Sequence, residues 1–182
     1  RSDIVEQVKS IYGISVSEST ISTISDKILA DVEEWSKRLL EPQYLIVWMD
    51  AVHLKVRVDG KYINNAMHVV IGLRADGLKE VLGMWLNKTE SASFWMTVLS
   101  DLKARGVEDI LIACTDNLTG FTKAIKGVFP ETITQLCIVH QIRNSSKFVV
   151  YKDRQQFCHD MKEIYTAINE EVAVDALNAL KN

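Results

Sequence analysis

A run of largely apolar residues that ends on a carboxylate constrains the fold of this chain more than any other feature of its sequence. The run covers residues 44–49, and Asp50 follows it. Its β-branched and aromatic residues, preceded by Pro42, predict a strand that is buried on both faces in the middle of a sheet. The same pattern returns between Asp109 and Asp116. Because α/β sheets place their sites at the carboxyl ends of strands, we expect Asp50 and Asp116 to lie at one site.

The composition is that of a soluble globular chain. Of its 182 residues, 47% are hydrophobic and 25% are charged, which suits one well-buried domain with an appendage. We expect neither a membrane span nor a signal peptide, because no apolar run is long enough. The net charge of −3 argues against a surface wrapped wholly in nucleic acid, but allows a local basic groove. Three cysteines without a secretory signal favour a reducing, cytoplasmic compartment.

Residues 1–41 have the apolar spacing of two helices separated by a turn at Gly13. Ser15 and Glu18 match a capping box at the start of the second helix. The arrangement is compatible with a helix-turn-helix, in which Ser19 and Thr20 would contact DNA from the start of the second helix. The alternative is an ordinary helical hairpin, used for packing or dimerisation, whose hydroxyl groups only cap the helix.

After Pro42 the apolar pattern changes from a helical period to alternation. Val52 to Val58 alternate with polar residues, and Asp59-Gly60 predicts a hairpin turn. Two further strands are expected at residues 62–73 and 80–86, which completes a three-stranded antiparallel meander. Lys55 and Arg57, on the polar face of the first hairpin, are candidate contacts to DNA phosphates, although exposed strand positions also carry charge for solubility.

The second half of the chain alternates helices with strands. It predicts a helix from Glu90 capped by Gly106, the strand that ends at Asp116, a short helix over 120–129, a fifth strand over 132–139 and a polar helical tail. The order of elements is that of a ribonuclease-H-like fold, an α/β fold with a mixed five-stranded sheet flanked by helices. In this fold the first and fourth strands are neighbours.

We therefore predict three regions. Residues 1–41 are a helical, helix-turn-helix-like DNA-binding segment, residues 42–148 are the ribonuclease-H-like core, and residues 149–182 begin a helical insertion.

Two neighbouring carboxylates predict a metal site. They repel each other unless a cation or a proton lies between them, and Mg²⁺ prefers oxygen ligands while keeping several waters. Two such ions would activate the attacking oxygen and stabilise the leaving oxygen of a phosphodiester, which predicts phosphoryl transfer on nucleic acid. The alternative is that Asp50 and Asp116 only cap the turns after their strands.

A second group of polar residues follows the fifth predicted strand. Cys137 and His140 have the spacing of zinc ligands, but Cys158-His159, the only other such pair, is adjacent and has poor geometry for two ligands. The alternative is that Cys137 is buried while His140 lies near the carboxylates and orients a ligand. Arg143 and Lys147, one helical turn apart, form either the basic side of a DNA groove or a solvated helix face.

Several stretches closely resemble the Mutator-type transposases of bacterial insertion sequences, and together they cover nearly the whole chain. The most specific is the Cys-x-x-His segment followed by Gln-Ile-Arg-Asn. The stretches are Asp50–Arg57, Gly106–Ala113 leading to Asp116–Phe121, Gln135–Asn144 and Tyr151–Arg154.

The resemblance implies a DDE transposase, in which two Asp residues and a Glu hold Mg²⁺ or Mn²⁺. By motif match, Asp50 and Asp116 are the first and second catalytic carboxylates, and Cys137 and His140 have a structural or site-orienting role. The implied partners are double-stranded DNA, both as transposon terminal inverted repeats and as target, and further copies of the chain in a homo-oligomer.

The third carboxylate is not recognisable in this chain. In the family it follows a helical insertion after the fifth strand, and none of the acidic residues after His140 has that context; they are Asp153, Asp160, Glu163, Glu170, Glu171 and Asp175. We therefore expect the chain alone to be inactive. Two alternatives remain: a non-catalytic DNA-binding or dimerisation module, and another ribonuclease-H-like nuclease such as a junction resolvase.

Overall fold

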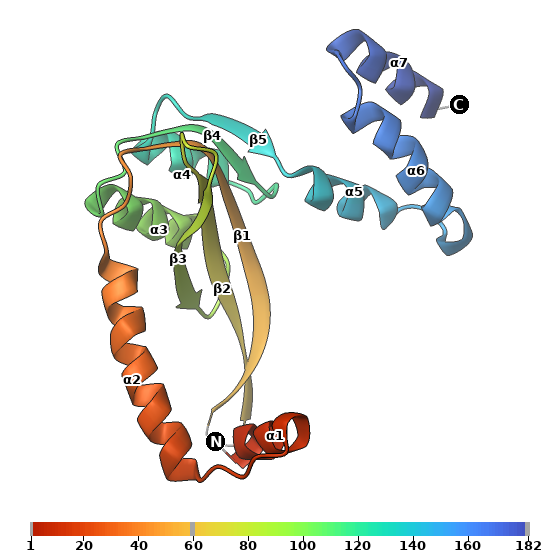
Figure 1. The fold of residues 1–182 in the computed structure, drawn as a ribbon. Coiled ribbons are helices and arrows are strands. Elements are labelled where there is room, and N and C mark those ends of the chain that lie inside the picture. The colour runs from red at the N-terminus through yellow and green to blue at the C-terminus, as the bar shows by residue number, and fades with distance from the viewer. Residues whose placement is uncertain (1, 59–60, 181–182) are drawn as a thin grey trace. The chain divides into compact units, whose positions relative to one another are not determined.

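The computed structural model describes residues 2–58 and 61–180 (Figure 1). The predicted hairpin turn at Asp59-Gly60 lies outside the described residues. The chain divides into two units, residues 1–40 and 41–182. Among the described residues, no helix has the length and apolar character needed to cross a lipid bilayer.

The first unit consists of helices α1 (Ser2–Tyr12) and α2 (Glu18–Lys37). The N-cap of α2 is Ser17, whose Oγ accepts a hydrogen bond from the backbone N–H of Thr20 at 3.1 Å. The predicted capping box at Ser15 and Glu18 is therefore wrong, because the helix begins at Glu18 itself and Thr20 occupies the third helical position. None of the α2 residues, all of which are described, is buried.

The second unit contains a five-stranded sheet with the order β3-β2-β1-β4-β5 (Figure 1). β1 pairs antiparallel with β2 and parallel with β4, so the first and fourth strands are neighbours. This order confirms the predicted ribonuclease-H-like arrangement. The strands are β1 (Gln43–Val58), β2 (Lys61–Leu73), β3 (Lys79–Asn87), β4 (Asp109–Thr115) and β5 (Ile133–Leu136).

β1 is longer than its apolar core suggests. The expectation that Asp50 marks the carboxyl end of its strand is wrong, because β1 continues to Val58, which pairs with Lys61 of β2. The pairing with β4 ends at Trp48 and Cys114. Asp50 therefore lies within β1, just beyond the point where β4 leaves its side.

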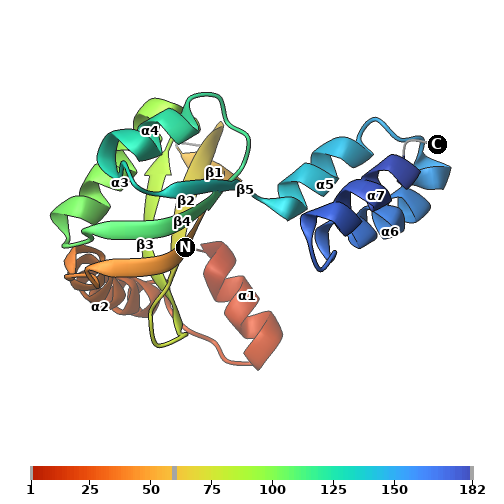
Figure 2. The same ribbon diagram turned by 90° about the horizontal axis from the view of Figure 1, so that it is seen from above.

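Helices α3 (Ala92–Ala104) and α4 (Phe121–Val128) pack together on one face of the sheet (Figure 2). The rings of Trp95 and Phe121 stack with centroids 4.6 Å apart. His68 of β2 is fully buried beside them, with Trp95 at 4.8 Å and Phe94 at 4.5 Å between ring centroids. Because side chains alternate along a strand, the residues next to His68 face the other side of the sheet, where Met84, the cross-strand partner of Val69, is exposed.

The helical tail begins earlier than predicted. The expected strand up to Val139 is wrong, because β5 ends at Leu136 and helix α5 (Ile138–Ser146) follows at once. The N–H of Cys137 donates to the carbonyl of Thr115 at 2.7 Å, which connects this segment to the end of β4. The remaining elements are a 3₁₀ turn (Tyr151–Asp153), α6 (Arg154–Tyr165) and α7 (Glu170–Leu180).

Tyr44 anchors the start of β1. Its fully buried ring lies so close to Gly72 that a Cβ there would be 2.5 Å from Tyr44 Cδ1. Its hydroxyl donates to Glu80 Oε1 at 2.7 Å and accepts from the Glu41 N–H at 3.2 Å. Burial, together with the hydrogen bond to Glu80, raises the pKa of Tyr44 to about 12.

We expect the stability of the protein to fall at high pH through Tyr44. A tyrosine in the unfolded chain titrates near 10, so the unfolded state loses this proton first as the pH rises. The stabilising effect is present below pH 10, and the free energy of unfolding should fall by up to roughly 2 to 3 kcal/mol as the pH rises from about 10 to about 12. Urea unfolding of the wild type and of Tyr44→Phe over this range measures the difference.

The matched control is Tyr62→Phe, because Tyr62 is an exposed tyrosine of the same sheet. It should follow the wild-type curve, since both retain Tyr44. An equally steep loss of stability in Tyr44→Phe would contradict this account.

Candidate active site around Asp50

The carboxylate of Asp50 is accessible to solvent. Its side chain is 56% exposed, and its Oδ1 accepts a hydrogen bond from the N–H of Ala51 at 2.8 Å. The backbone position is rigid on one side, since Asp50 pairs with Val69 of β2. An accessible carboxylate on a paired strand is suited to meet a ligand from solvent with little rearrangement.

Asp116 follows β4 directly. Counted from the last paired residues, Trp48 and Cys114, Asp50 and Asp116 are each two positions further along the chain, just beyond the paired part of two neighbouring parallel strands. Asp116 Oδ1 accepts from the N–H of Leu118 at 3.2 Å, so its carboxylate also caps the turn after the strand. The turn-capping alternative is thus realised at Asp116, while its other oxygen remains available as a ligand.

His140 is the residue that approaches Asp50. It lies in the first turn of α5, and its Nε2 is 3.6 Å from Asp50 Oδ1. Cys137 is the N-cap of the same helix, and its backbone hydrogen bond to Thr115 places the helix start beside the end of β4. His140 thus lies beside Asp50, one of the two predicted carboxylates, and it reaches this residue from a helix and not from the end of a strand.

A pocket of about 300 Å³ opens beside Asp50. One part of its lining is apolar and includes Trp48 and Ile71. The polar part consists of Asp50, Cys114, Cys137 and His140. Cys114 is not among the residues predicted for the site, and its only signal in the sequence is its position on a strand, two residues before Asp116. Burial, and secondarily the proximity of Cys137, raises the pKa of the Cys114 thiol above its ordinary value.

The described residues contain oxygen donors of the kind that a hard cation prefers, but they do not form a group of three possible metal ligands. Within residues 2–58 and 61–180, no three His, Cys, Asp or Glu side chains gather closely enough to hold a metal ion. Asp50 and Asp116 offer carboxylate oxygens, which Mg²⁺ and Mn²⁺ prefer, whereas a zinc site would need thiolate and imidazole groups arranged around one point. The later acidic residues are on or next to the C-terminal helices α6 and α7.

The candidate DNA contacts are distributed over three elements. Ser19 and Thr20 are in the first turn of α2, where both hydroxyls contact Ser17 Oγ, at 2.7 and 2.8 Å. Lys55 and Arg57 are exposed on the second half of β1. Arg143 and Lys147 are exposed at the end of α5.

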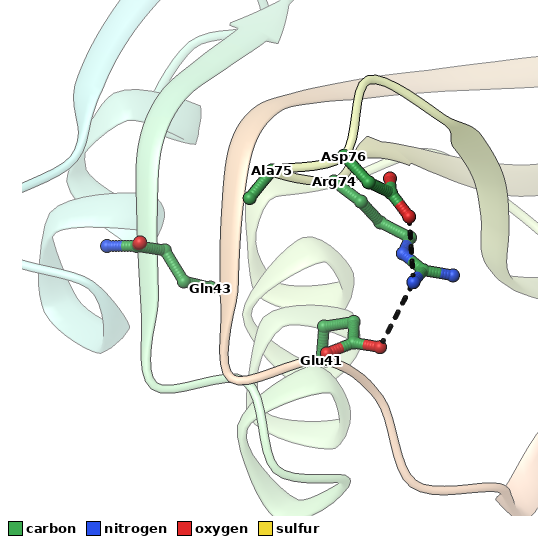
Figure 3. Close-up of a pocket in the computed structure, with 5 residues that line it drawn as sticks. All are labelled: Glu41, Gln43, Arg74, Ala75 and Asp76. Carbon is green, nitrogen blue, oxygen red and sulfur yellow. Dashed lines mark ion pairs between the residues drawn. The ribbon is translucent and has the colours of Figure 1, made fainter.

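A second pocket lies at the start of β1 (Figure 3). Arg74 lines this pocket, and its guanidinium group is 3.0 Å from the carboxylate of Asp76 and 3.6 Å from that of Glu41. Figure 3 shows both ion pairs. Because both carboxylates pair with Arg74, the lining residues offer no unpaired cation to an anionic ligand. It connects the start of β1 to the turn between β2 and β3 and is not a candidate catalytic site.

Comparison with known proteins decides the family. The model described as "Transposase, Mutator family" matches residues 2–182. The chain belongs to the Mutator transposase family. A probable transposase of an ISRM3-like insertion sequence from Sinorhizobium fredii is 46% identical over 179 residues, covering 98% of this chain and 45% of that protein. The ISRM3 transposase of Rhizobium meliloti is 45% identical, with the same coverage.

This Mutator-family chain spans about half the length of the curated relatives it matches. Among solved structures, the HTLV-2 integrase catalytic core in complex with magnesium is 17% identical, with a TM-score of 0.37 over 79% of this chain and 85% of that one. Such a score does not establish a common fold. The ribonuclease-H-like assignment rests on the strand order of the sheet.

We expect Cys114 to react slowly with alkylating reagents at neutral pH. Because its thiol pKa is raised by burial, less of it is in the reactive thiolate form. The rate of iodoacetamide labelling at Cys114, followed against pH by peptide mass spectrometry without divalent cations, should have its midpoint above that of a free cysteine peptide. Cys137→Ser should lower this midpoint only partly, since burial is the larger cause. A midpoint at or below the value for the free cysteine peptide would contradict the raised pKa of the Cys114 thiol.

Proposed function

We propose that this chain supplies the first two catalytic carboxylates, Asp50 and Asp116, of a transposase that cleaves DNA at the ends of an insertion sequence and joins the freed ends to target DNA. The observation that carries the proposal is their placement at equivalent positions of neighbouring strands, directly beyond the last β1–β4 pair. Membership of the Mutator family supports the same reaction class.

Mg²⁺ or Mn²⁺ is the proposed cofactor, held by Asp50 and Asp116. When bound, such ions activate the attacking oxygen and stabilise the leaving oxygen of a phosphodiester. The chain's own contribution is orientation: His140, 3.6 Å from Asp50 Oδ1, restrains that carboxylate, and the Cys137–Thr115 hydrogen bond holds the helix that carries His140. We therefore assign Cys137 and His140 a site-orienting role.

The proposed partner is double-stranded DNA, as terminal inverted repeats and as target, bound by a homo-oligomer in the bacterial cytoplasm. In this scheme the helix-turn-helix-like segment over 1–41 contacts DNA through Ser19 and Thr20. The core over 42–148 contacts DNA phosphates through four exposed basic residues, Lys55, Arg57, Arg143 and Lys147. Exposed Lys and Arg side chains supply most of the non-specific affinity of proteins for DNA.

We further propose that this chain alone is catalytically incomplete, with residues 149–182 as the beginning of a helical insertion that precedes the catalytic Glu. The lack of a three-ligand group among the described residues supports this reading. The same observation favours a second candidate function for the isolated chain, namely a non-catalytic DNA-binding or dimerisation module.

Calorimetric titration with Mn²⁺ tests the metal site. The wild-type chain should show a weak binding enthalpy that disappears in the Asp50→Ala, Asp116→Ala double variant, because two oxygen ligands on neighbouring strands are lost together. An Asp175→Asn, Glu171→Gln variant, altered at two exposed acidic residues of α7, should titrate as the wild type does. Equal heats from the wild type and the Asp50, Asp116 variant would show that these carboxylates do not form the site.

Transposition by a full-length protein carrying this sequence tests the reaction. Asp50→Ala should lower the frequency of transposition by more than roughly 10³-fold, the scale on which removal of a catalytic group acts. Asp175→Asn should leave the frequency unchanged. Retained transposition in Asp50→Ala would overturn the catalytic assignment and favour the non-catalytic module.

A further inference from the structure

The segment between α5 and α6 exposes two aromatic rings to solvent. Phe148 is 92% exposed and Tyr151 is 87% exposed, more than any other aromatic residue in the described part of the chain. We call residues 147–154 the aromatic turn. Single exposed apolar side chains are common on protein surfaces, but two nearly fully exposed rings within four residues indicate a binding surface.

The aromatic turn is basic although the chain as a whole is acidic. Residues 147–154 contain three basic side chains and one acidic one, and Arg143 precedes them, whereas the whole chain has a net charge of −3. Lys147 Nζ donates to the neutral amide of Asn144, and Arg154 Nε donates to the carbonyl of Val149. Neither contact neutralises its cation, and no ion pair in the described part of the chain involves Arg143, Lys147, Lys152 or Arg154.

The backbone of the aromatic turn is ordered by hydrogen bonds. The N–H groups of Lys147, Phe148 and Val149 each donate to a carbonyl three residues earlier, at 3.1 to 3.3 Å. The N–H of Asp153 donates to Val150 in the same way, at 3.0 Å. The two rings are thus presented from a defined backbone, which lowers the entropy cost of binding.

We propose that the aromatic turn is a stacking platform for unpaired DNA bases. This inference rests on the proposed function, because cleavage at DNA ends is what would bring unpaired bases to this chain. Aromatic rings interleaved with cations bind single strands, since each base offers a π-face for stacking and the phosphates meet the cations. A protein partner fits the surface less well, because lysines are depleted in the cores of protein interfaces.

The position of the aromatic turn suits this role. It directly follows α5, the helix whose first turn carries His140 at 3.6 Å from Asp50. A nine-residue helix is about 14 Å long, so α5 separates the turn from the carboxylates by the length of a few nucleotides. The platform would hold bases adjacent to the strand that reacts, without being part of the catalytic group itself.

Fluorescence anisotropy with a labelled oligothymidylate of about 12 nucleotides, in EDTA, tests the proposal. The wild-type chain should bind this single strand more tightly than a duplex of equal length. A Phe148→Ala, Tyr151→Ala double variant should bind the single strand about tenfold or more weakly, the scale of aromatic–base stacking. A variant with both Phe148→Tyr and Tyr151→Phe should bind as tightly as the wild type, because each position keeps an aromatic ring.

The control Tyr62→Ala removes another exposed tyrosine, 72% exposed and beside Lys61, and should bind as the wild type. Phe148→Trp adds a direct readout: the introduced indole should be quenched by the bound strand. Unchanged affinity in the double alanine variant, or binding of the Phe148→Trp variant without quenching, would overturn the proposal.

The same assay separates this inference from the proposed function. Asp50→Ala with Asp116→Ala should not weaken binding of the single strand in EDTA, since stacking needs no metal and the loss of two carboxylates removes only repulsion of phosphates. Conversely, the double alanine variant of the aromatic turn should retain Mn²⁺ binding. If single-strand binding fails, Mn²⁺ binding still tests the proposed function, and if Mn²⁺ binding fails, single-strand binding still tests the aromatic turn.

Discussion

The parallel pairing of β1 with β4 is the interaction on which the rest of the structure depends. It joins residues that are 66 positions apart in the sequence, Gln43 with Asp109. It also makes β1 the only described strand with one antiparallel and one parallel neighbour. Where this ladder ends, two backbones that each carry an Asp separate, and the N–H of Cys137 takes the next carbonyl of β4. The candidate site is a consequence of that termination.

Most of the sheet could be predicted from the sequence because its signals are local. Two buried apolar runs, alternation after Asp50 and glycine-containing turns were enough to give the number, order and direction of the strands. The end of β1 was not predicted from the sequence, because Asp50 breaks the apolar run while the backbone pairing with β2 continues to Val58. Hydrophobic pattern reports which side chains are buried, and backbone pairing extends beyond them.

The site itself was only partly predictable. Cys137-Ile138-Val139-His140 has β-branched residues that favour a strand, yet β5 ends at Leu136, the N–H of Cys137 donates to the carbonyl of Thr115, and α5 begins at Ile138. His140 consequently reaches Asp50 from a helix. Cys114 was missed because one cysteine in an apolar strand resembles any small buried residue. Only the pairing register brings it beside Trp48 and into the same pocket as Asp50.

The two halves of β1 differ in the number of strands beside them. Up to Trp48 it has a neighbour on each side, whereas from Leu54 to Val58 it pairs with a part of β2 that has no third strand beside it in the described residues. A two-stranded ribbon is only marginally stable and twists more strongly than a wide sheet. Bending of this ribbon therefore concentrates near Leu54, whereas Asp50 pairs with Val69 in a part of the sheet where β3 is also present. A load on the ribbon would therefore be taken up beyond Asp50, and the wider sheet would keep the backbone of this carboxylate in place.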